Sequence, residues 1–489
     1  MKHKVPKEVS RVTETLQNAG FEAYLVGGCV RDLLMDKTPK DWDITTNAVP
    51  EQIIDLFEET FYENSFGTVG IVNKELDKNS PAHIIEVTPY RLETEYSDNR
   101  RPDKITFSNS LEEDLERRDF TVNAIAYDIS KEVFVDPYKG QKDIKDKILR
   151  TVGEPLDRFS EDALRMLRAV RLATQLGFTI NINTFNAVVE HSKNLKTISQ
   201  ERLRDEFSKI IGTDNPMEGI ILAHKIGVLQ YIAPELEVGI GVDQNGIHIY
   251  DVWEHNLRSL QHASDKNYSF HVKLAALLHD VGKPISRRWS KENNNWTFYG
   301  HDVVGGRVSR EMLKRLRFSR ETIDVVSRLV RYHMFFSDVD QITLSAVRRI
   351  IVNVGKEHIW ELIDLRTCDR IGTGRPKEIP YRLRKYQAMI DEALHDPISV
   401  GMLKIDGQKI LDVTREKPGP KIGFILHALL EEVLDDPKRN TEIYLEKRTS
   451  ELIKMSVAEL KALGEQGKEK KDTEEKREVA EIRKKRHVE

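Results

Sequence analysis

The spacing of hydrophobic and polar positions divides the chain into two regions. In the first 150 residues, short apolar runs alternate with brief helical segments. The runs predict strands at Phe21–Val26, Trp42–Thr45 and Ile84–Val87. Helices are predicted at Arg31–Met35 and at Gln52–Phe57, the second with Pro50 in its first turn. Because the connections are short, this region is expected to be an α/β domain with antiparallel or mixed strand pairing.

From about residue 155 the strand signals fade and helical spacing dominates. Helices are predicted at Ala163–Leu176, Thr184–His191, Glu201–Ile211 and Met217–Ile226, and the chain stays mainly helical to about residue 460. Residues 464–489 alternate Lys or Arg with Glu and carry almost no apolar side chains, which indicates a solvated helix or a disordered tail.

Composition limits the function classes. The 489 residues include 76 Lys and Arg against 80 Asp and Glu, a formal net charge of -4. This excludes a uniformly basic nucleic-acid coat but leaves room for a local basic groove. No stretch approaches the roughly 18–20 apolar residues of a membrane span, and no secretory leader is evident. Two cysteines, Cys29 and Cys368, are too few for a disulfide framework, so a cytoplasmic protein without a membrane partner is expected.

A first motif combines a glycine turn with paired carboxylates. A predicted strand ends at Gly27-Gly28 and a helix follows at once, so the backbone can approach a phosphate that Arg31 also reaches. Asp41 and Asp43 follow; at positions i and i+2 of a strand they would share one face, about 6–7 Å apart. Two carboxylates so placed can hold Mg²⁺ ions that bind a triphosphate and activate a hydroxyl.

These residues resemble the head of the polymerase-β-type nucleotidyltransferase superfamily. More narrowly, they are similar to the bacterial class of tRNA nucleotidyltransferases, the CCA-adding enzymes, and their poly(A) polymerase relatives. The resemblance implies that a third carboxylate can assist the pair, and Glu86 is the candidate.

A second motif, Arg117-Arg118-Asp119, precedes an apolar run. Arg118 can donate a fork of hydrogen bonds to ribose or phosphate, and Asp119 can accept one from a sugar hydroxyl. A plain surface salt bridge of Arg118 with Glu112 or Glu113 is the alternative for such a motif on its own. RRDFTVNA is similar to the family's ribose-selecting motif; residues 94–102 resemble its flexible loop, and Asp136–Gly140 resembles its hinge motif.

A third motif lies on the predicted helix from Ala163 to Leu176. Ser160 is the expected N-cap, with Glu161 and Asp162 in the first turn. A carboxylate accepts from the exocyclic amine that C and A share, and an arginine donates to a ring acceptor, so Asp162 with Arg165 could select C and A without an RNA template. Glu161, Asp162 and Arg165 resemble the family's amino-acid template, and Arg168 and Arg171 match its triphosphate-contacting arginines. A charged helix with local ion pairs is the alternative.

A fourth motif is a histidine and aspartate set in the helical region. Adjacent His279 and Asp280 on an apolar helix both need partners when buried. The set is similar to the ligands of the HD phosphohydrolase superfamily, which here would be His255, His279, Asp280, Asp369 and, as in its two-metal members, His301 and His333. Imidazole and carboxylate ligands suit several divalent metals, and spacing does not choose among them. By the same resemblance, Lys283 could bind a phosphate.

The resemblance implies an enzyme that adds C, C and A to the 3′ end of tRNA from CTP and ATP and releases pyrophosphate. Two alternatives remain: an enzyme adding only CC, only A or poly(A), or an HD phosphohydrolase with an RNA-binding head. The expected domains are a nucleotidyltransferase head (1–150), a helical neck (151–240), an HD metal-binding domain (241–375), a helical tRNA-binding region (376–463) and a charged tail (464–489).

Overall fold

The computed structural model describes residues 4–62, 67–94, 104–244, 248–292, 294–335 and 342–463. The chain divides into two compact units, one ending at Pro234 and one starting at Glu235. The charged tail and most of the expected flexible loop lie outside the described residues. Within the described part, no helix is long and apolar enough to cross a membrane.

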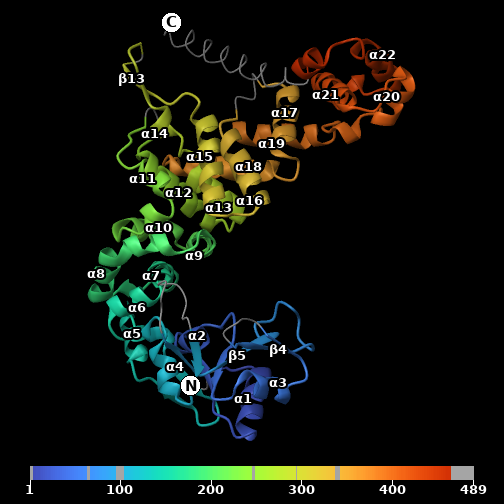
Figure 1. The fold of residues 1–489 in the computed structure, drawn as a ribbon. Helices are drawn as coiled ribbons and strands as arrows, with labels where there is room; N and C mark the ends of the chain where they lie inside the picture. Colours follow the sequence, from blue (N-terminus) through green and yellow to red (C-terminus); the bar gives the residue numbers. More distant parts are fainter. Residues whose placement is uncertain are drawn as a thin grey trace. The chain divides into compact units, whose positions relative to one another are not determined.

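A seven-stranded mixed sheet forms the centre of the first unit (Figure 1). In spatial order its strands are β3 (Thr60–Tyr62), β4 (Val69–Val72), β5 (Ile84–Pro89), β2 (Asp43–Thr46), β1 (Ala23–Val26), β8 (Ala126–Asp128) and β9 (Val133–Val135). Only the β2–β5 pair is parallel among these neighbours, and the other pairs are antiparallel. The predicted mixed α/β head is confirmed.

One face of this sheet is apolar and the other carries polar side chains. Leu25, Ile44 and Ile85 are fully buried and pack in one cluster with apolar side chains of α1 (Lys7–Asn18), α2 (Gly28–Leu34) and α3 (Pro50–Leu56). Because successive strand side chains alternate between faces, Asp43 and Glu86 lie on the opposite face. A short helix, α4 (Leu111–Glu116), contributes Leu115 to a small cluster with Val26 and Ala126. The hydrophobic face therefore anchors the sheet and leaves the polar face for chemistry.

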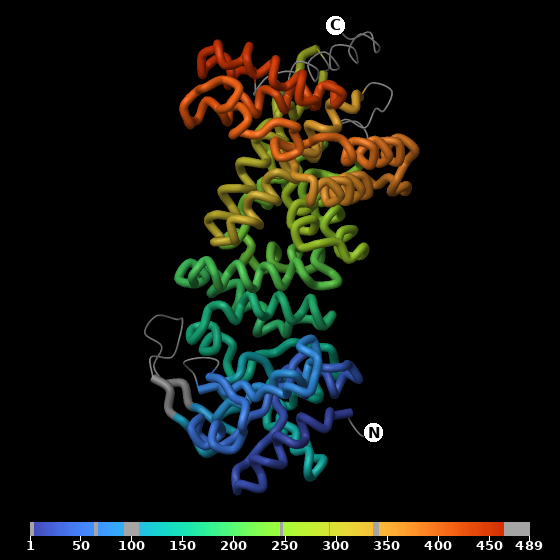
Figure 2. The backbone as a smooth tube through the Cα atoms, turned by 90° about the vertical axis from the view of Figure 1, so that its right-hand side faces the viewer, coloured from blue at the N-terminus to red at the C-terminus, as the bar shows by residue number. Residues whose placement is uncertain are grey.

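The neck is helical, as predicted, and follows the sheet domain within the same unit (Figure 2). After α5 (Gly140–Asp146) and β10 (Ile148–Leu149), which lie in the head range, the neck contains α6 (Pro155–Glu161), α7 (Leu164–Leu176), β11 (Thr179–Ile180), α8 (Ile182–His191), α9 (Gln200–Ile211) and α10 (Pro216–Lys225). Phe120 and Val122 of the head pack with Ala169, Leu172 and Ala173 of α7. A shared apolar core thus joins the second motif to the helix that carries the third.

The start of that helix corrects one sequence prediction. Ser160 is not its N-cap: Ser160 lies inside α6, where its hydroxyl donates to the Leu156 carbonyl at 2.8 Å. Glu161 ends α6, Asp162 caps its C-terminus, and α7 begins only at Leu164. Pro155 lies in the first turn of α6, where proline favours the start of a helix. The apolar spacing that predicted the longer helix did not reveal this separate short helix.

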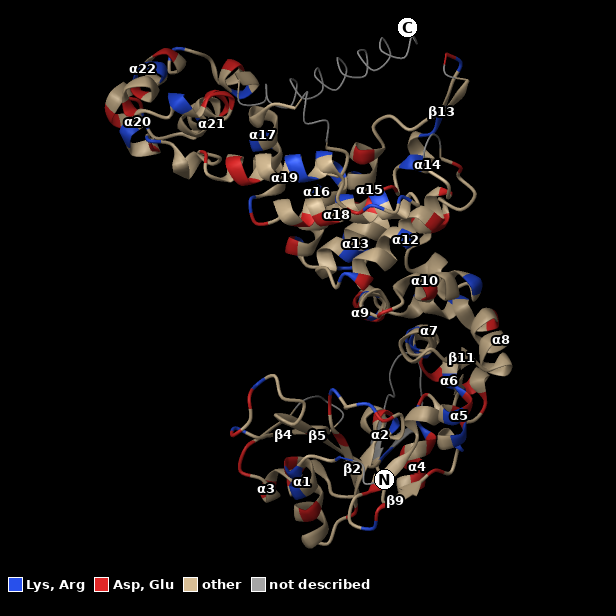
Figure 3. Cartoon of the chain, turned by 180° about the vertical axis from the view of Figure 1, so that it is seen from behind, with Lys and Arg blue, Asp and Glu red and all other residues tan. Residues whose placement is uncertain are grey.

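The second unit is largely helical. It contains α11 (Pro234–Glu237), α12 (Val252–Asp265), α13 (Phe270–Leu278), α14 (Lys283–Ser286), α15 (His301–Arg315), α16 (Arg320–Tyr332), α17 (Leu344–Val354), α18 (Ile359–Gly372), α19 (Tyr381–Leu394), α20 (Gly407–Thr414), α21 (Pro420–Asp435) and α22 (Glu442–Leu452). A hairpin of β12 (Arg288–Ser290) and β13 (Asn295–Thr297), which the sequence reading did not predict, precedes α15. Acidic and basic side chains are interspersed over the helices of both units (Figure 3).

Candidate active site and metal centre

The glycine turn of the first motif has the predicted geometry. β1 ends at Val26, Gly27 adopts φ 79°, and α2 begins at Gly28. A Cβ atom on Gly27 would lie 3.3 Å from Arg118 Nη1 and 3.4 Å from Asp43 Oδ2. Glycine is needed there for the positive φ, and its missing side chain leaves room between a guanidinium and a carboxylate.

The carboxylates meet at this turn. Asp43 is the first residue of β2, whereas Asp41 precedes the strand in a bend, so the pair does not lie on one strand as the sequence suggested. Both still approach the glycines, since a Cβ on Gly28 would lie 3.9 Å from Asp41 Oδ1. Glu86 is the register partner of Asp43 in the parallel β2–β5 pair, which places both side chains on the same face. Asp41 and Asp43 at the glycine turn, with Glu86 next to Asp43, offer hard oxygen donors that suit a Mg²⁺ ion.

A cavity of 220 Å³ opens on this face of the sheet. It is lined by Val26, Asp43, Ile44, Thr68, Thr88, Arg91, Arg117 and Arg118. The lining therefore combines a carboxylate with three guanidinium groups, a charge pattern that fits a metal-bound polyphosphate.

Arg117 and Arg118 are held by a buried carboxylate that the sequence reading did not identify. Asp114 is fully buried, accepts from Arg117 Nη2 at 2.6 Å and Arg118 Nη2 at 3.0 Å, and also accepts from the Thr45 hydroxyl at 3.1 Å. Burial raises the pKa of Asp114, but the two guanidinium groups outweigh it and lower the pKa below its ordinary value. The alternative for this motif was a salt bridge of Arg118 with Glu112 or Glu113. Arg118 binds Asp114 instead and lies beside Gly27.

Asp119 is a junction between head and neck. Its Oδ2 binds Arg168 of α7, with Nη2 at 2.6 Å, while its Oδ1 accepts from the Phe120 amide at 2.9 Å and from Asn123 Nδ2 at 3.3 Å. Asn123 also accepts from Arg31 Nη1 at 2.8 Å. Burial would raise the pKa of Asp119, but the charge and hydrogen bond of Arg168 lower it to about 2. This chain of contacts connects Arg31 to the neck.

The Asp119–Arg168 pair leads to a prediction about pH and stability. The folded pKa of about 2 lies below the roughly 3.9 of an unfolded aspartate, so the carboxylate stabilises the fold above pH ~4 and loses that effect as pH falls towards 2. Asp119→Asn should lower the free energy of unfolding by about 2–3 kcal/mol at pH 7 and by roughly half as much at pH 3. Urea unfolding at both pH values measures this, with the exposed Asp157→Asn on α6 as control. A deficit that stays constant with pH would contradict the assignment.

The segment Asp136–Gly140, which resembles the family's hinge motif, packs against the chain just after Asp119. Asp136 accepts from the Gly140 amide at 2.7 Å and from the Gln141 amide at 3.0 Å, which caps the start of α5. A Cβ on Gly140 would lie 2.1 Å from the Thr121 carbonyl oxygen, so only glycine fits there. Asp136–Gly140 is therefore positioned to hold the segment that follows Asp119.

Each side chain of the third motif has its own partner. Asp162 Oδ2 binds Arg202 Nη2 of α9 at 2.6 Å, and Asp162 Oδ1 accepts from the Leu164 amide at 3.0 Å. Arg165 binds Glu161 and donates to the Arg117 carbonyl at 3.0 Å, while its amide donates to the Asp162 carbonyl at 3.0 Å. Asp162 and Arg165 are thus neighbours at the start of α7.

Further along α7, Arg171 Nε binds Glu206 of α9 at 2.7 Å. The sequence reading missed Arg202 and Glu206, although their spacing of four residues on an amphipathic helix puts them on one polar side. Arg168 and Arg171 are held by Asp119 and Glu206 respectively, so both expected triphosphate-binding arginines stand in ion pairs.

The histidine and aspartate set converges in the second unit. His255 lies on α12, His301 begins α15, and Asp369 lies on α18. His279 and Asp280 follow the last residue of α13 rather than lying inside that helix as expected, and His333 likewise follows α16. Helix ends therefore aim four of the six side chains at one point.

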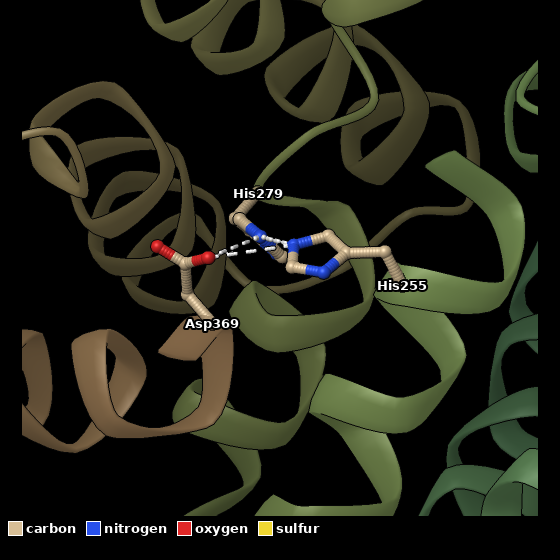
Figure 4. Close-up of side chains that lie close together, drawn as sticks. All are labelled: His255, His279 and Asp369. Carbon is tan, nitrogen blue, oxygen red and sulfur yellow. Dashed lines mark hydrogen bonds and ion pairs between the residues drawn. The ribbon is translucent and has the colours of Figure 1, made fainter. Parts of the chain in front are cut away.

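Asp280 connects two groups of ligands. Its Oδ2 lies 3.2 Å from His255 Nε2 and 3.4 Å from His279 Nε2, and its Oδ1 lies 3.4 Å from His301 Nε2 and 3.5 Å from His333 Nε2. Figure 4 shows Asp369 facing both His255 and His279, with its Oδ1 at 3.4 and 3.8 Å from their Nε2 atoms. The six residues form two ligand triads, one of His255, His279 and Asp369 and one of Asp280, His301 and His333. Asp280 also approaches the first triad, an arrangement that suits two metal ions.

Backbone carbonyl groups orient three of the four imidazole rings through their Nδ1 atoms. The Nδ1 atoms of His279, His301 and His333 lie 2.9, 2.8 and 2.7 Å from the carbonyl oxygens of Ala276, Phe298 and Val330. A carbonyl there requires a proton on Nδ1 and leaves the Nε2 lone pair free for a metal. Among the described residues, Asp280 Oδ1 and His301 Nε2 are buried without a hydrogen-bond partner, so the residues fit a metal ion.

Burial and neighbouring charges shift the pKa values of the ligands in this centre. Burial would lower the pKa of His255, but Asp280 and Asp369 raise it to about 9. Burial would raise the pKa of both carboxyls, yet Lys283 and the histidines hold that of Asp280 well below its usual range, and Arg366 and the histidines do the same for Asp369. Both carboxylates are thus ionised and available as ligands at neutral pH.

A cavity of 370 Å³ adjoins this centre. Besides the ligands Asp280, His301, His333 and Asp369, it is lined by the basic side chains Lys283, Arg366, Arg370, Arg375 and Arg382. Lys283 Nζ binds Asp280 Oδ2 at 2.6 Å and Gln244 Oε1 at 2.5 Å. The cavity is suited to a phosphate-bearing ligand next to a metal centre.

Comparison with known proteins matches three family models: a poly A polymerase head domain over residues 23–150, a probable RNA- and SrmB-binding site of polymerase A over 177–239, and an HD domain over 252–370. The CCA-adding enzyme of Lactobacillus delbrueckii subsp. bulgaricus is 32% identical over 435 residues, which is 88% of this chain and 94% of that protein. The CCA-adding enzyme of Geobacillus sp. is 44% identical over 222 residues, 45% of this chain and about half (53%) of that protein.

Solved structures resemble the whole described fold. The crystal structure of the Bacillus stearothermophilus CCA-adding enzyme in complex with CTP is 26% identical, with a TM-score of 0.68 over 91% of this chain and 98% of that one. A Thermotoga maritima CCA-adding enzyme complexed with tRNA, at 18% identity and a TM-score of 0.51, shares the fold over 92% of this chain and 97% of that one.

Proposed function

This chain belongs to the family of CCA-adding enzymes, and from that premise we propose that it adds C, C and A to the 3′ end of tRNA from CTP and ATP. The tRNA 3′-hydroxyl attacks the α-phosphate of the incoming nucleotide, the new P–O bond forms, and pyrophosphate leaves. The observation that carries the proposal is the convergence of Asp41, Asp43 and Arg118 on the Gly27-Gly28 turn, beside a cavity lined by arginines.

We assign the metal-binding role to Asp41 and Asp43, with Glu86 beside Asp43 as the third carboxylate. Mg²⁺ bound there would lower the pKa of the 3′-hydroxyl and offset charge on the triphosphate. Gly27 and Gly28 give the phosphates access to the backbone. Arg31 and Arg118, each fixed by a carboxylate neighbour, orient the triphosphate by charge-assisted hydrogen bonds.

We propose that nucleotide choice is made at the start of α7. Asp162 would accept from the exocyclic amine of C or A, and Arg165 would donate to the ring acceptor beside it. Arg202 and Glu161 support this pair, because each holds one of the two side chains in place. Asp119 is proposed to accept from the ribose hydroxyl, and Arg168 and Arg171 to contact the triphosphate.

Removing either template side chain should change selectivity more than rate. Asp162→Ala or Arg165→Ala is expected to raise incorporation of U and G relative to C and A by roughly tenfold to a hundredfold, since one base-reading contact contributes about 1–3 kcal/mol of discrimination. Competition assays with mixed nucleotides measure the ratio, and Arg202→Ala should show a smaller change of the same kind. Equal slowing with all four nucleotides would show that α7 is only structural.

The whole activity is tested by product length. Purified protein is given tRNA ending just before the first C, ending in C, or ending in CC, with one nucleoside triphosphate at a time. We expect CTP to extend the first two substrates and ATP to extend only the third. Extension of the third alone would identify an A-adding enzyme, extension of the first two alone a CC-adding enzyme, and long A tails a poly(A) polymerase.

The second unit supports a further candidate activity. Two ligand triads joined by Asp280, next to a cavity with four arginines and a lysine, favour a divalent metal centre that hydrolyses phosphate esters. We propose this as an additional activity of the enzyme. It does not replace nucleotide addition, because the head keeps both aspartates and the template residues.

The proposed domains are the head (1–150), the neck (151–240), the HD domain (241–375), a helical tRNA-binding region (376–463) and the charged tail (464–489). Arg348 and Arg349 of α17, in the HD domain, bind Asp396 and Glu431 of the helical region that follows, which joins that region to the HD domain. A cytoplasmic location is proposed because Cys29 and Cys368 are both buried free thiols, as a reducing compartment favours.

A further inference from the structure

A second cluster of imidazole and carboxylate groups lies on α13 and α18, away from the HD centre. His271 is in the first turn of α13, His358 is the N-cap of α18, and Glu361 is in the first turn of α18. His358 Nδ1 lies 2.8 Å from Glu361 Oε2, and His271 Nδ1 lies 3.8 Å from Glu361 Oε1. The ligand atoms offered by the three residues all lie within 4.8 Å of one another.

This spacing fits a transition metal. Ligands at about 2.0–2.1 Å from a tetrahedral Zn²⁺ ion lie ~3.3 Å from one another. The separation is 2.8 Å from His358 Nδ1 to one oxygen of Glu361 and 3.8 Å from His271 Nδ1 to its other oxygen, on either side of that value, and all the ligand atoms lie within 4.8 Å of one another. Rotations of the side chains would therefore bring them to ligand distances. His271, His358 and Glu361 are each about one-fifth exposed, which leaves an open side for water as a fourth ligand.

Neighbouring groups orient the cluster. Ser269, the N-cap of α13, donates its hydroxyl to Glu361 Oε1 at 2.5 Å. Glu357 Oε1 lies 3.9 Å from His358 Nε2, so the ring has a carboxylate behind it while its Nδ1 faces the cluster. Hydrogen-bonded carboxylate ligands and carboxylates behind ligating imidazoles are the usual outer shell of a protein metal site.

The two helices place this cluster apart from the HD centre. His279, which directly follows α13, comes eight positions after His271, and Asp369 comes eight positions after Glu361 on α18. At 1.5 Å per residue, each interval spans about 12 Å. α13 packs against α18 (Figure 1). His271 and Glu361 lie at the starts of these helices and His279 and Asp369 at or near their ends, so the two clusters lie at opposite ends of the helix pair.

We propose that His271, His358 and Glu361 bind one divalent transition-metal ion of the Zn²⁺ class, separate from the HD centre. Imidazole and carboxylate ligands favour Zn²⁺ over Mg²⁺ or Ca²⁺. The ion fastens the N-terminal ends of α13 and α18 together. His279 directly follows the other end of α13 and Asp369 lies near the other end of α18, so the ion supports the geometry of the HD centre without taking part in its chemistry.

The test is Zn²⁺ stoichiometry in the full-length protein. Chelator-stripped samples are dialysed against Zn²⁺, and bound metal is measured by elemental analysis. The double variant His271→Ala plus His358→Ala should bind one Zn²⁺ fewer per chain than wild type. His427→Ala, an exposed histidine on α21, should bind as much as wild type. Zn²⁺ should also raise the Tm of wild type more than that of the double variant.

Glu361→Gln is the second variant, because the amide keeps the size of the side chain and an acceptor for Ser269. It should weaken Zn²⁺ binding at this site at least about tenfold while its Tm in chelator stays near that of wild type. Equal Zn²⁺ content in wild type and the double variant would overturn the proposal. Should the double variant not fold, unchanged Zn²⁺ affinity in Glu361→Gln would overturn it equally.

Discussion

Replacing Asp43 by asparagine should slow nucleotide addition at least about a thousandfold while tRNA affinity stays within about twofold. Asparagine keeps the shape of the side chain but removes the negative charge that a divalent metal requires. A thousandfold loss corresponds to about 4 kcal/mol of barrier, a reasonable effect of losing one metal ligand. Asp41→Asn should have the same direction, since Asp41 faces the same glycine turn.

Single-turnover extension of tRNA measures the rate, and filter binding measures the tRNA affinity. Asp55→Asn is the matched control, because Asp55 is exposed on α3, the helix packed on the opposite face of the sheet. We expect the control to react like wild type. Wild-type rates in both Asp41→Asn and Asp43→Asn would exclude the paired-carboxylate mechanism.

The combined substitution His279→Ala plus Asp280→Ala should remove metal from the HD centre and abolish any hydrolysis of 2′,3′-cyclic nucleotides or phosphate esters. His279 belongs to one ligand triad and Asp280 to the other, so the combined loss leaves both triads incomplete. Addition of C, C and A should be retained, because the residues proposed for that reaction all belong to the other unit.

Elemental analysis, ester hydrolysis and tRNA extension are measured on the same preparations. His395→Ala, an exposed histidine at the end of α19, serves as the control for loss of an imidazole. His301→Ala is the milder variant and should remove only the metal of the Asp280–His301–His333 triad. Equal metal content in wild type and the double variant would show that these histidines only pack the core.

Local sequence was sufficient to predict features that depend on a single turn or a single helix. The apolar run before Gly27-Gly28 predicted both the strand and the helix that follows it, because glycine at that turn has few structural alternatives. The helical spacing over Ala163–Leu176 likewise predicted α7, in which Leu167, Val170 and Leu172 are buried. The residues named for the HD centre also converge, although their order in the chain gives no distances.

Local sequence did not predict where α6 ends and α7 begins. Ser160, Glu161 and Asp162 have the composition of a helix start, yet Pro155 begins a separate helix and the chain bends at Asp162. Asp162 then binds Arg202, forty residues away. Capping preferences are worth only about 1 kcal/mol, so packing of α6 and α7 with their neighbours overrides them.

The sequence by itself determined the chemistry available to this protein: the glycine turn, the paired aspartates, the arginine-rich α7 and the six HD side chains. Only the tertiary structure decided how these groups are paired, with Asp119 on Arg168, Asp114 on Arg117 and Arg118, and Glu206 on Arg171. The reason is physical. Residue type fixes which bonds a side chain can form, whereas a buried charge takes whichever opposite charge the folded backbone brings within reach.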